Sequence, residues 1–147
     1  RFTLRGPYGT FQLREPVTHD VLGVAFNAGI APLMSMVRNH FPRYADTPQR
    51  FAIIYAYSND DLFLYGRLLE AMAREHERLS IFPLETHSED PAEFPERLIA
   101  NALAQCVDTP ATWQAYVAGL GKFIEGVAPL IEAAGIEQSR MAGERYD

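Results

Sequence analysis

The feature that most constrains the fold is an apolar strand followed at once by a tight turn and a helix. Residues 21–25 are almost wholly apolar, the turn contains Asn27 and Gly29, and Pro32 stands in the first turn of the expected helix. A continuous apolar run is typical of a parallel strand covered on both faces, and Pro is well tolerated where a helix begins. Backbone N–H groups at such a helix start point at whatever lies above the strand, and phosphate is the usual ligand. We therefore predict a strand–turn–helix unit suited to phosphate.

Strands and helices alternate along the rest of the chain. Further strands are predicted at 51–57, 79–84 and 112–118, with a last extended piece at 140–146 and helices between the strands. Ser58-Asn59-Asp60-Asp61 is expected to cap the second helix, and residues 11–13 to form a short additional strand. The alternation predicts an α/β fold: a doubly wound, mainly parallel five-stranded sheet with helices on both faces, which is Rossmann-like.

Composition excludes several classes of function. The chain has 147 residues, enough for one domain with a core, and a formal net charge of −6 that argues against a nucleic-acid groove or an anionic membrane surface. No apolar run is long enough for a membrane span. Cys106 is the only cysteine, which excludes an intrachain disulfide and fits a cytoplasmic protein. The four histidines lack metal-ligand spacing with each other or with Cys106, so no metal site is expected.

Five motifs together resemble one known family. In order they are Gly6-Pro7-Tyr8-Gly9, residues 25–32, residues 55–65, residues 116–123 and Glu144-Arg145-Tyr146. They resemble the pyridine-nucleotide-binding half of ferredoxin–NADP reductase-type flavoproteins. In that family the motifs read Gly-Pro-x-Gly, Gly-Thr-Gly-Ile-Ala-Pro, Tyr-Gly-x-Arg with a Leu-x-Tyr pair, Cys-Gly-Pro and Glu-x-aromatic. Each motif is weak alone, but their joint order covers nearly the whole chain.

The resemblance implies a domain organisation and two cofactors. Residues 1–16 correspond to the C-terminal remnant of a flavin-binding β-barrel domain and its linker, and residues 17–147 to the NAD(P)-binding domain. NAD(P)H is expected to bind here, whereas FAD is held mainly by the domain missing from this chain. The implied activity passes hydride from NAD(P)H to FAD and electrons onward to an iron–sulfur protein or a flavodoxin-like carrier. Without its FAD domain the fragment is expected to be inactive.

The resemblance also implies which residues form the site. Glu144 and Tyr146 are expected to be catalytic, the aromatic ring lying against the flavin and the carboxyl group aiding proton movement. The positions expected to bind the cofactor follow the first four strands: Asn27, Ala28, Gly29, Ile30, Ala31, Pro32, Tyr57, Ser58, Thr86, His87, Ala118, Gly119, Leu120 and Gly121. The plain alternatives are a tight turn without a ligand, a solvated polar loop at Thr86-His87-Ser88 and an ordinary strand end at Glu144.

Two finer expectations follow. A side chain at Gly29 would block a pyrophosphate, so Gly29→Val is expected to weaken nucleotide binding far more than it lowers thermal stability. The loop that selects between NAD and NADP in the family holds Thr86-His87-Ser88 here, flanked by Glu85, Glu89 and Asp90. Acidic neighbours disfavour a 2′-phosphate, which favours NAD.

Departures from the family motifs keep other functions open. Asn27 and Ala28 stand where the family has Gly and Thr, and Ala118 and Leu120 where it has Cys and Pro. Asn tolerates left-handed backbone, whereas loss of the Thr hydroxyl removes about 1 kcal/mol of hydrogen bonding. The alternative function is therefore a divergent non-catalytic domain of this fold that serves as a docking or regulatory module. A weaker alternative is another nucleotide-binding α/β protein, such as a flavodoxin-like one.

Overall fold

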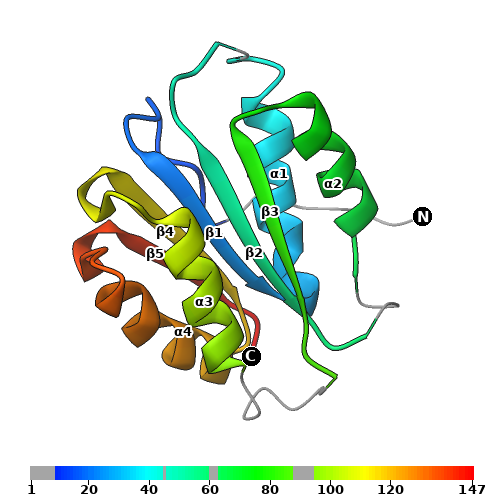
Figure 1. Cartoon of the computed structure of the whole chain (residues 1–147), viewed down its shortest axis with the longest axis vertical. Helices are drawn as coiled ribbons and strands as arrows, with labels where there is room; N and C mark the ends of the chain where they lie inside the picture. Colours follow the sequence, from blue (N-terminus) through cyan, green and yellow to red (C-terminus); the bar gives the residue numbers. More distant parts are fainter. Residues whose placement is uncertain (1–8, 45, 60–62, 88–94) are drawn as a thin grey trace.

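The computed structural model describes residues 9–44, 46–59, 63–87 and 95–147 (Figure 1). Parts of the sequence predictions therefore lie outside the described residues, namely those on residues 6–8, 60–62 and 88–94. The strands are β1 (Asp20–Phe26), β2 (Phe51–Tyr57), β3 (Leu79–Glu85), β4 (Trp113–Gly119) and β5 (Met141–Arg145). The α-helices are α1 (Ile30–His40), α2 (Gly66–Glu75), α3 (Glu96–Cys106) and α4 (Gly121–Ala133).

The five strands form one parallel sheet in the order β3-β2-β1-β4-β5. Helices α1 and α2 cover one face and α3 and α4 the other (Figure 1). The predicted doubly wound, five-stranded α/β fold is therefore confirmed. The chain leaves β1 toward β2 on one side and later places β4 on the other, so the topological switch point lies between β1 and β4. In open α/β sheets ligands bind at the carboxyl ends of strands beside such a switch point.

The central strand is apolar along its length because it has a hydrophobic layer on each side. Leu22, Val24 and Phe26 pack toward α3 and α4, whereas Val21 and Ala25 pack toward α1 and α2. Successive side chains of a strand point to opposite faces, so only a continuous apolar run fills both layers. This packing fixes the end of β1, and with it the turn that starts the candidate site.

Two local predictions are wrong. Residues 11–13 are described as irregular backbone rather than a strand, and the Phe11 and Leu13 side chains pack against the hydrophobic layer beneath α1. Helix α2 begins at Gly66, and Tyr65 precedes it with a positive φ of 57°, so Ser58 does not cap it. Ser58 instead bonds with Asn27.

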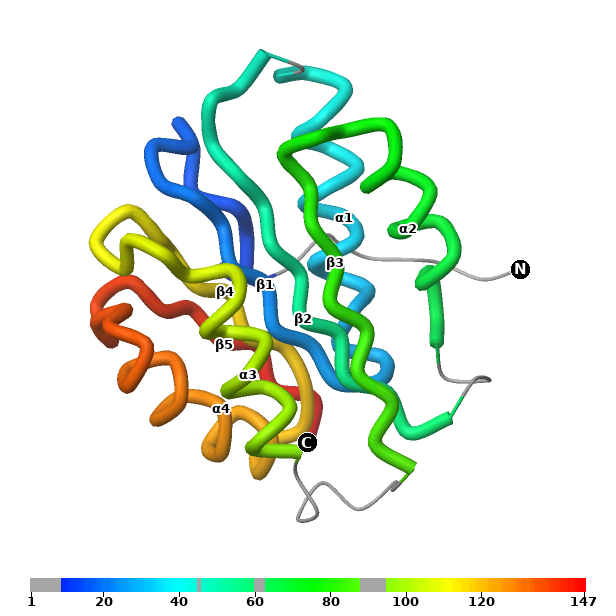
Figure 2. Tube along the Cα trace, in the orientation of Figure 1, coloured from blue at the N-terminus to red at the C-terminus, as the bar shows by residue number. Residues whose placement is uncertain are grey.

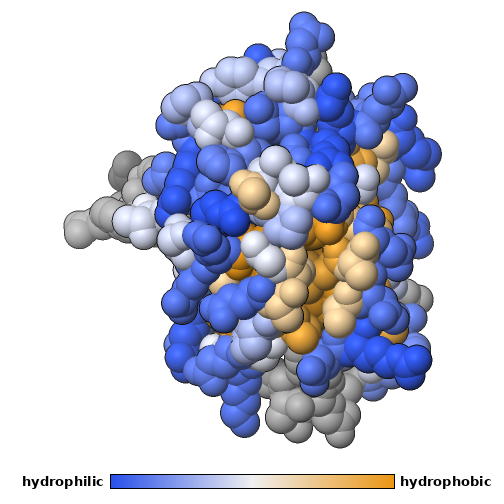
Figure 3. Space-filling view, turned by 60° about the vertical axis from the view of Figure 1, so that its left-hand side comes forward, coloured by the Kyte–Doolittle hydropathy of each residue, from blue (hydrophilic) through white to orange (hydrophobic). Residues whose placement is uncertain are grey.

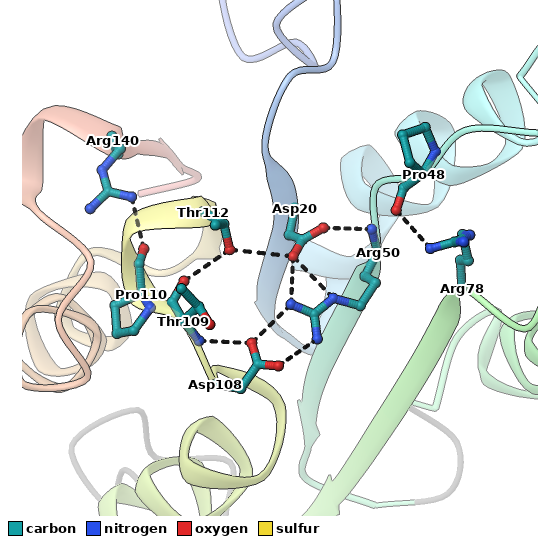
Figure 4. A network of polar contacts seen from close by, with 9 residues as sticks. All are labelled: Asp20, Pro48, Arg50, Arg78, Asp108, Thr109, Pro110, Thr112 and Arg140. Atoms are coloured by element: carbon teal, nitrogen blue, oxygen red, sulfur yellow. Dashed lines mark hydrogen bonds and ion pairs between the residues drawn. The ribbon is translucent and has the colours of Figure 1, made fainter.

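The amino edge of the sheet is closed by ion pairs (Figure 4). Asp20 accepts hydrogen bonds from the Arg50 backbone N–H at 2.8 Å and from its Nη2 at 2.6 Å, and Asp108 accepts from Arg50 Nη1 at 2.8 Å. The hydrogen bond from the Arg50 guanidinium holds the pKa of Asp108 well below its usual range. The same guanidinium lies 5.0 Å from the centre of a Trp113 ring. This network joins the starts of β1, β2 and β4 and leaves the opposite edge as the place for a ligand.

Among the described residues, none of the helices has the length and apolar character that crossing a membrane requires.

Candidate functional site

The candidate site lies along the carboxyl edge of the sheet, at the lower end of all five strands in Figure 2. A short 3-10 turn, Asn27–Gly29, follows β1 and leads directly into α1. The first turn of α1 consists of the uncharged residues Ile30, Ala31, Pro32 and Leu33. Ala28 and Ala31 are exposed, whereas Gly29 and Ile30 are buried. The first turn of α1 thus contains no acidic side chain that would compensate the positive end of the helix dipole, and its exposed position is occupied by the small residue Ala31.

Gly29 sits where β1 and β4 approach each other at the switch point. A Cβ added at Gly29 would overlap the Ala118 carbonyl oxygen and would lie 2.7 Å from the Ala118 carbonyl carbon and 3.2 Å from the Gly119 nitrogen. These atoms belong to the backbone of β4, which lies between β1 and β5 in the sheet, so they cannot move aside cheaply. The expectation that a side chain at Gly29 affects nucleotide binding much more than stability is therefore not supported by the packing. Close approach of β4 requires glycine here whether or not a ligand is bound.

The Asn27 side chain ties the end of β1 to the end of β2. Its Nδ2 donates to Ser58 Oγ at 3.0 Å, and its Oδ1 accepts from the Ser58 backbone N–H at 3.0 Å. Asn27 has a φ of 46°, in the left-handed region that Asn tolerates better than most residues. The Asn27 amide therefore points toward the end of β2. Ala28, and not Asn27, is the exposed residue next to Gly29. Ser58 is buried beneath this contact.

The residues after β2 and β3 extend the edge away from the switch point. The Thr86 backbone N–H donates to the Tyr57 carbonyl at 2.8 Å. His87 has a φ of 56° and an exposed ring whose Nδ1 lies 3.3 Å from Glu85 Oε1. His87 therefore lies two strands from the Gly29 turn, and Glu85, its neighbour in this contact, is the last residue of β3.

Two open hollows adjoin this part of the edge. One of about 570 Å³ is lined by Tyr57, Phe63 and the start of α2, and one of about 410 Å³ is lined by Ala31 and other residues on the outer face of α1. Tyr65 lines both hollows and is half exposed. The rings of Tyr57 and Phe63 lie 4.6 Å apart, so aromatic surface lines the larger hollow.

The two expected catalytic residues lie on or just after β5. Glu144 pairs in register with Ala118 of β4, and the Tyr146 backbone N–H donates to the Gly119 carbonyl at 3.3 Å. The Tyr146 side chain remains 45% exposed. Partial burial, and secondarily the Glu144 carboxylate, raise the pKa of Tyr146, so its phenol is neutral at physiological pH. The structure thus brings both residues next to the end of β4.

Sequence reasoning missed two residues at the same place. Asp147 Oδ1 accepts from the Gly121 backbone N–H at 2.9 Å and from Arg145 Nε at 2.8 Å. A Cβ at Gly121 would run into the Arg145 guanidinium, so this glycine is also needed for a close approach. No local sequence pattern could have predicted the contact between Gly121 and Asp147, because these residues are 26 positions apart in the chain.

The expected site residues thus form three groups along one edge. The central group holds the Gly29 turn with Ala118 and Gly119, and Asn27 with Ser58 lies beside it. A second group, on the β5 side, contains the expected catalytic residues. The third, after β3, is separated from the first by β2. A ligand that contacts all three must be long and must lie across the strand ends.

Comparison with known families matches most of the chain to one domain model. Residues 25–128 match the family described as the oxidoreductase NAD-binding domain. The chain is 26% identical over 147 residues to the ferredoxin–NAD(P)(+) reductase component of the naphthalene 1,2-dioxygenase system of Pseudomonas putida, covering 97% of this chain and 43% of that protein. It is 37% identical over 60 residues to the electron transfer component of the 2-halobenzoate 1,2-dioxygenase of Burkholderia cepacia, covering 41% of this chain and 17% of that protein. The chain therefore spans less than half the length of these relatives.

Two solved reductase structures have the same fold as this chain. The ferredoxin–NADP+ reductase of Plasmodium falciparum superposes with a TM-score of 0.77 at 16% identity, covering 95% of this chain and 59% of that one. The cytochrome P450 reductase GcoB of Amycolatopsis superposes with a TM-score of 0.75 at 22% identity, covering 95% of this chain and 42% of that one. At these identities the superpositions establish the fold.

Proposed function

Because the chain belongs to the oxidoreductase NAD-binding domain family, we propose that it binds NAD(P)H across the carboxyl edge of its sheet and presents the nicotinamide to FAD. The observation that carries this proposal is the turn at the switch point, where Ala28 and Ala31 leave the N-terminus of α1 open to an anion. Helix N-termini stabilise phosphate through unpaired N–H groups and the helix dipole. The uncharged first turn of α1 fits a pyrophosphate.

The two halves of the dinucleotide then fall on opposite sides of this turn. The nicotinamide half lies toward β4 and β5, beside Gly119 and Tyr146, and the adenosine half lies toward Tyr57 and Thr86. Aromatic surface in the hollow at Tyr57 and Phe63 favours stacking of a base. We also retain NAD as the preferred cofactor, because Glu85 beside His87 disfavours a 2′-phosphate.

The chemistry of the reaction belongs to the cofactors: nicotinamide supplies a hydride and FAD accepts it. This chain holds the dinucleotide in position and excludes water around it. Tyr146 follows β5, and its exposed ring, beside the end of β4, lies where the nicotinamide ring is expected to bind. Glu144 pairs with Ala118 of β4 and offers a carboxylate that holds or moves a proton there.

We propose that FAD is held by a neighbouring domain, and that residues 1–16 are the C-terminal end of that domain and its linker. Residues 11–17 already pack toward the α1 side: the Arg14 N–H donates to the Tyr116 hydroxyl at 2.9 Å, and the Phe11 ring meets Tyr116 edge-on at 5.9 Å. In Figure 3, with the β5 side of the molecule turned forward, apolar residues gather in the lower half of the face. Apolar surface of this kind suits a docked domain.

The final electron acceptor is an iron–sulfur protein or a flavodoxin-like carrier. Support comes from the curated relatives, which are a ferredoxin reductase component and an electron transfer component of dioxygenase systems. The alternative of a non-catalytic docking module predicts a folded domain with no affinity for either nucleotide.

Titration with NADH and NADPH by calorimetry tests the proposal. A matched pair of variants is Ala28→Asp and Ala111→Asp, since each residue is the exposed middle residue of a 3-10 turn, one at the carboxyl and one at the amino edge. Ala28→Asp places a carboxylate beside the pyrophosphate and is expected to weaken binding about tenfold, or about 1.4 kcal/mol. It should not lower stability, because an acidic residue near a helix N-terminus is favourable.

Unchanged affinity in Ala28→Asp would remove the Gly29 turn from the binding site, and no binding by the folded wild type would favour the docking module. Ala111→Asp is expected to bind like the wild type. In the longer protein that carries FAD, Tyr146→Ala is expected to change nicotinamide affinity or the rate of hydride transfer. Unchanged kinetics would remove Tyr146 from the site.

A further inference from the structure

The segment that precedes β1 is attached to the face of β4. The Arg14 backbone N–H donates to the Tyr116 hydroxyl at 2.9 Å, and the Phe11 ring meets the Tyr116 ring edge-on at 5.9 Å. In the orientation that gives both atoms of the Gln114 amide suitable partners, its oxygen accepts from Arg14 Nε at 3.1 Å and from Nη1 at 3.3 Å. We call these contacts of Phe11 and Arg14 with Gln114 and Tyr116 the linker anchor.

The β4 side of the linker anchor consists of buried polar groups. Tyr116 is 1% exposed and Gln114 is 7% exposed. Burial raises the pKa of Tyr116, so its hydroxyl is neutral at physiological pH. A buried hydroxyl or amide without a hydrogen-bond partner is costly, and here Arg14 supplies the partner of both. The attachment therefore belongs to the packed interior, although Arg14 itself is exposed.

The strand that holds the linker anchor also carries one side of the candidate site. Tyr116 precedes Ala118 by two residues, so their side chains point to the same face and their Cα atoms lie about 6.6 Å apart along β4. Ala118 and Gly119 adjoin the Gly29 turn, and Glu144 of β5 pairs with Ala118. The segment that leads to the proposed FAD domain is thus attached two residues from the place proposed for the nicotinamide half.

Hydride transfer depends steeply on the distance between the reacting atoms. Productive geometry brings these atoms to about 3–3.5 Å, and a misplacement of about 1 Å can cost about 100-fold in rate. In the proposed function one reacting atom is held by this domain and the other by its neighbour. Attachment of the linker to β4 refers both positions to a single strand, so motion elsewhere in the sheet changes their separation less.

We propose that Tyr116 is a positioning residue for hydride transfer: by holding the Arg14 N–H, it fixes the neighbouring FAD domain relative to the nicotinamide place at the end of β4. The inference rests on the proposed function. Tyr116 acts through the linker and not by contact with a cofactor. Loss of its hydroxyl should therefore slow hydride transfer without changing the affinity of this domain for NADH.

Stopped-flow measurement of flavin reduction by NADH, in the longer protein that carries FAD, tests the positioning role. Tyr116→Phe keeps the ring that packs against Phe11 and removes only the hydroxyl. At saturating NADH the rate should fall about two- to tenfold, the factor that corresponds to the net contribution of one hydrogen bond, with KM unchanged. Gln12→Ala is the matched control, since Gln12 is an exposed residue of the same segment whose Nε2 donates to the Gly9 carbonyl at 3.3 Å.

A second readout needs neither FAD nor catalysis and uses the chain of 147 residues. The Arg14 amide should be protected from hydrogen exchange in the wild type and in Gln12→Ala, and its exchange should quicken about two- to tenfold in Tyr116→Phe. Calorimetry on the same three proteins should give equal affinities for NADH. An unprotected Arg14 amide in the wild type would overturn the linker anchor, and weaker NADH binding in Tyr116→Phe would overturn a role confined to positioning.

Flavin reduction at the wild-type rate in folded Tyr116→Phe would overturn the inference and leave the proposed function intact, as would equal slowing in Gln12→Ala. If Tyr116→Phe fails to fold, Arg14→Ala applies the same test, because Arg14 is exposed and its replacement removes the contact with Gln114. A longer protein whose wild type does not pass hydride from NADH or NADPH to FAD would overturn the proposed function itself, and the positioning role with it.

Discussion

Replacing Gly29 with Ala tests whether the turn at the switch point is built for packing or for a ligand. Gly29 has φ −58° and ψ −15°, which any residue can adopt, so backbone strain does not enter. The added Cβ meets the Ala118 carbonyl group and the Gly119 nitrogen of β4. β4 lies between β1 and β5 in the sheet, so relief requires a shift of the strand backbone.

The magnitude follows from two opposing effects. Overpacking in a core costs about 1–3 kcal/mol. Loss of glycine's freedom in the unfolded chain returns about 0.4–1 kcal/mol in favour of Ala. We therefore expect Gly29→Ala to lower the free energy of unfolding by about 1–2 kcal/mol, or the midpoint temperature by about 3–8 °C for a domain of this size.

Urea unfolding followed by circular dichroism measures the effect, with Gly143→Ala as the control. A Cβ at Gly143 would lie 3.8 Å from its nearest neighbours, which is ordinary contact, so that variant should be at least as stable as the wild type, by up to about 1 kcal/mol. Calorimetry on the same samples gives nucleotide affinity. A Gly29→Ala variant as stable as the wild type, with binding lost, would refute the packing argument and restore the view that this glycine serves only a pyrophosphate.

Three further predictions concern the ends of the strands. Asn27→Ala should lower the free energy of unfolding by about 2 kcal/mol, because it removes two hydrogen bonds to Ser58 and places Ala at a positive φ. Asn27→Gly removes the same hydrogen bonds without the strain, so its loss of stability should be smaller by about 1 kcal/mol. Urea unfolding of both variants checks this order. Asp20→Ala should lower the free energy of unfolding by about 1–3 kcal/mol, because Arg50 loses its half-buried acceptor and keeps only the contact with Asp108. Asp20→Asn should lower it less, because the amide oxygen can still accept from the Arg50 backbone N–H. The pKa of Asp108 is lowered by Arg50, so its contribution to stability is complete above the unfolded pKa of about 3.9 and is lost as the pH falls through the lower folded value. Unfolding curves at pH 7, 5 and 3 should therefore show a smaller acid loss in Asp108→Asn than in the wild type, and equal losses would contradict the pairing.

The fold could be predicted from the sequence because its main signals are local. Apolar runs at β1, β2 and β4 are long and continuous, and polar or glycine-containing turns separate them from amphipathic helices. A buried parallel strand needs side chains on both faces, so its own composition reports its environment. Irregular segments carry weaker signals, which explains the errors at residues 11–13 and at the start of α2.

The order of residues along the chain also determined the edge on which the candidate site lies, since the carboxyl ends of parallel strands meet there. Only the tertiary structure decided what each residue does on that edge. Gly29 is required by the backbone of β4, Asn27 turns toward Ser58, and Asp147 reaches the start of α4. Such contacts join residues far apart in sequence, and they depend on strand order and side-chain direction, which no local pattern encodes.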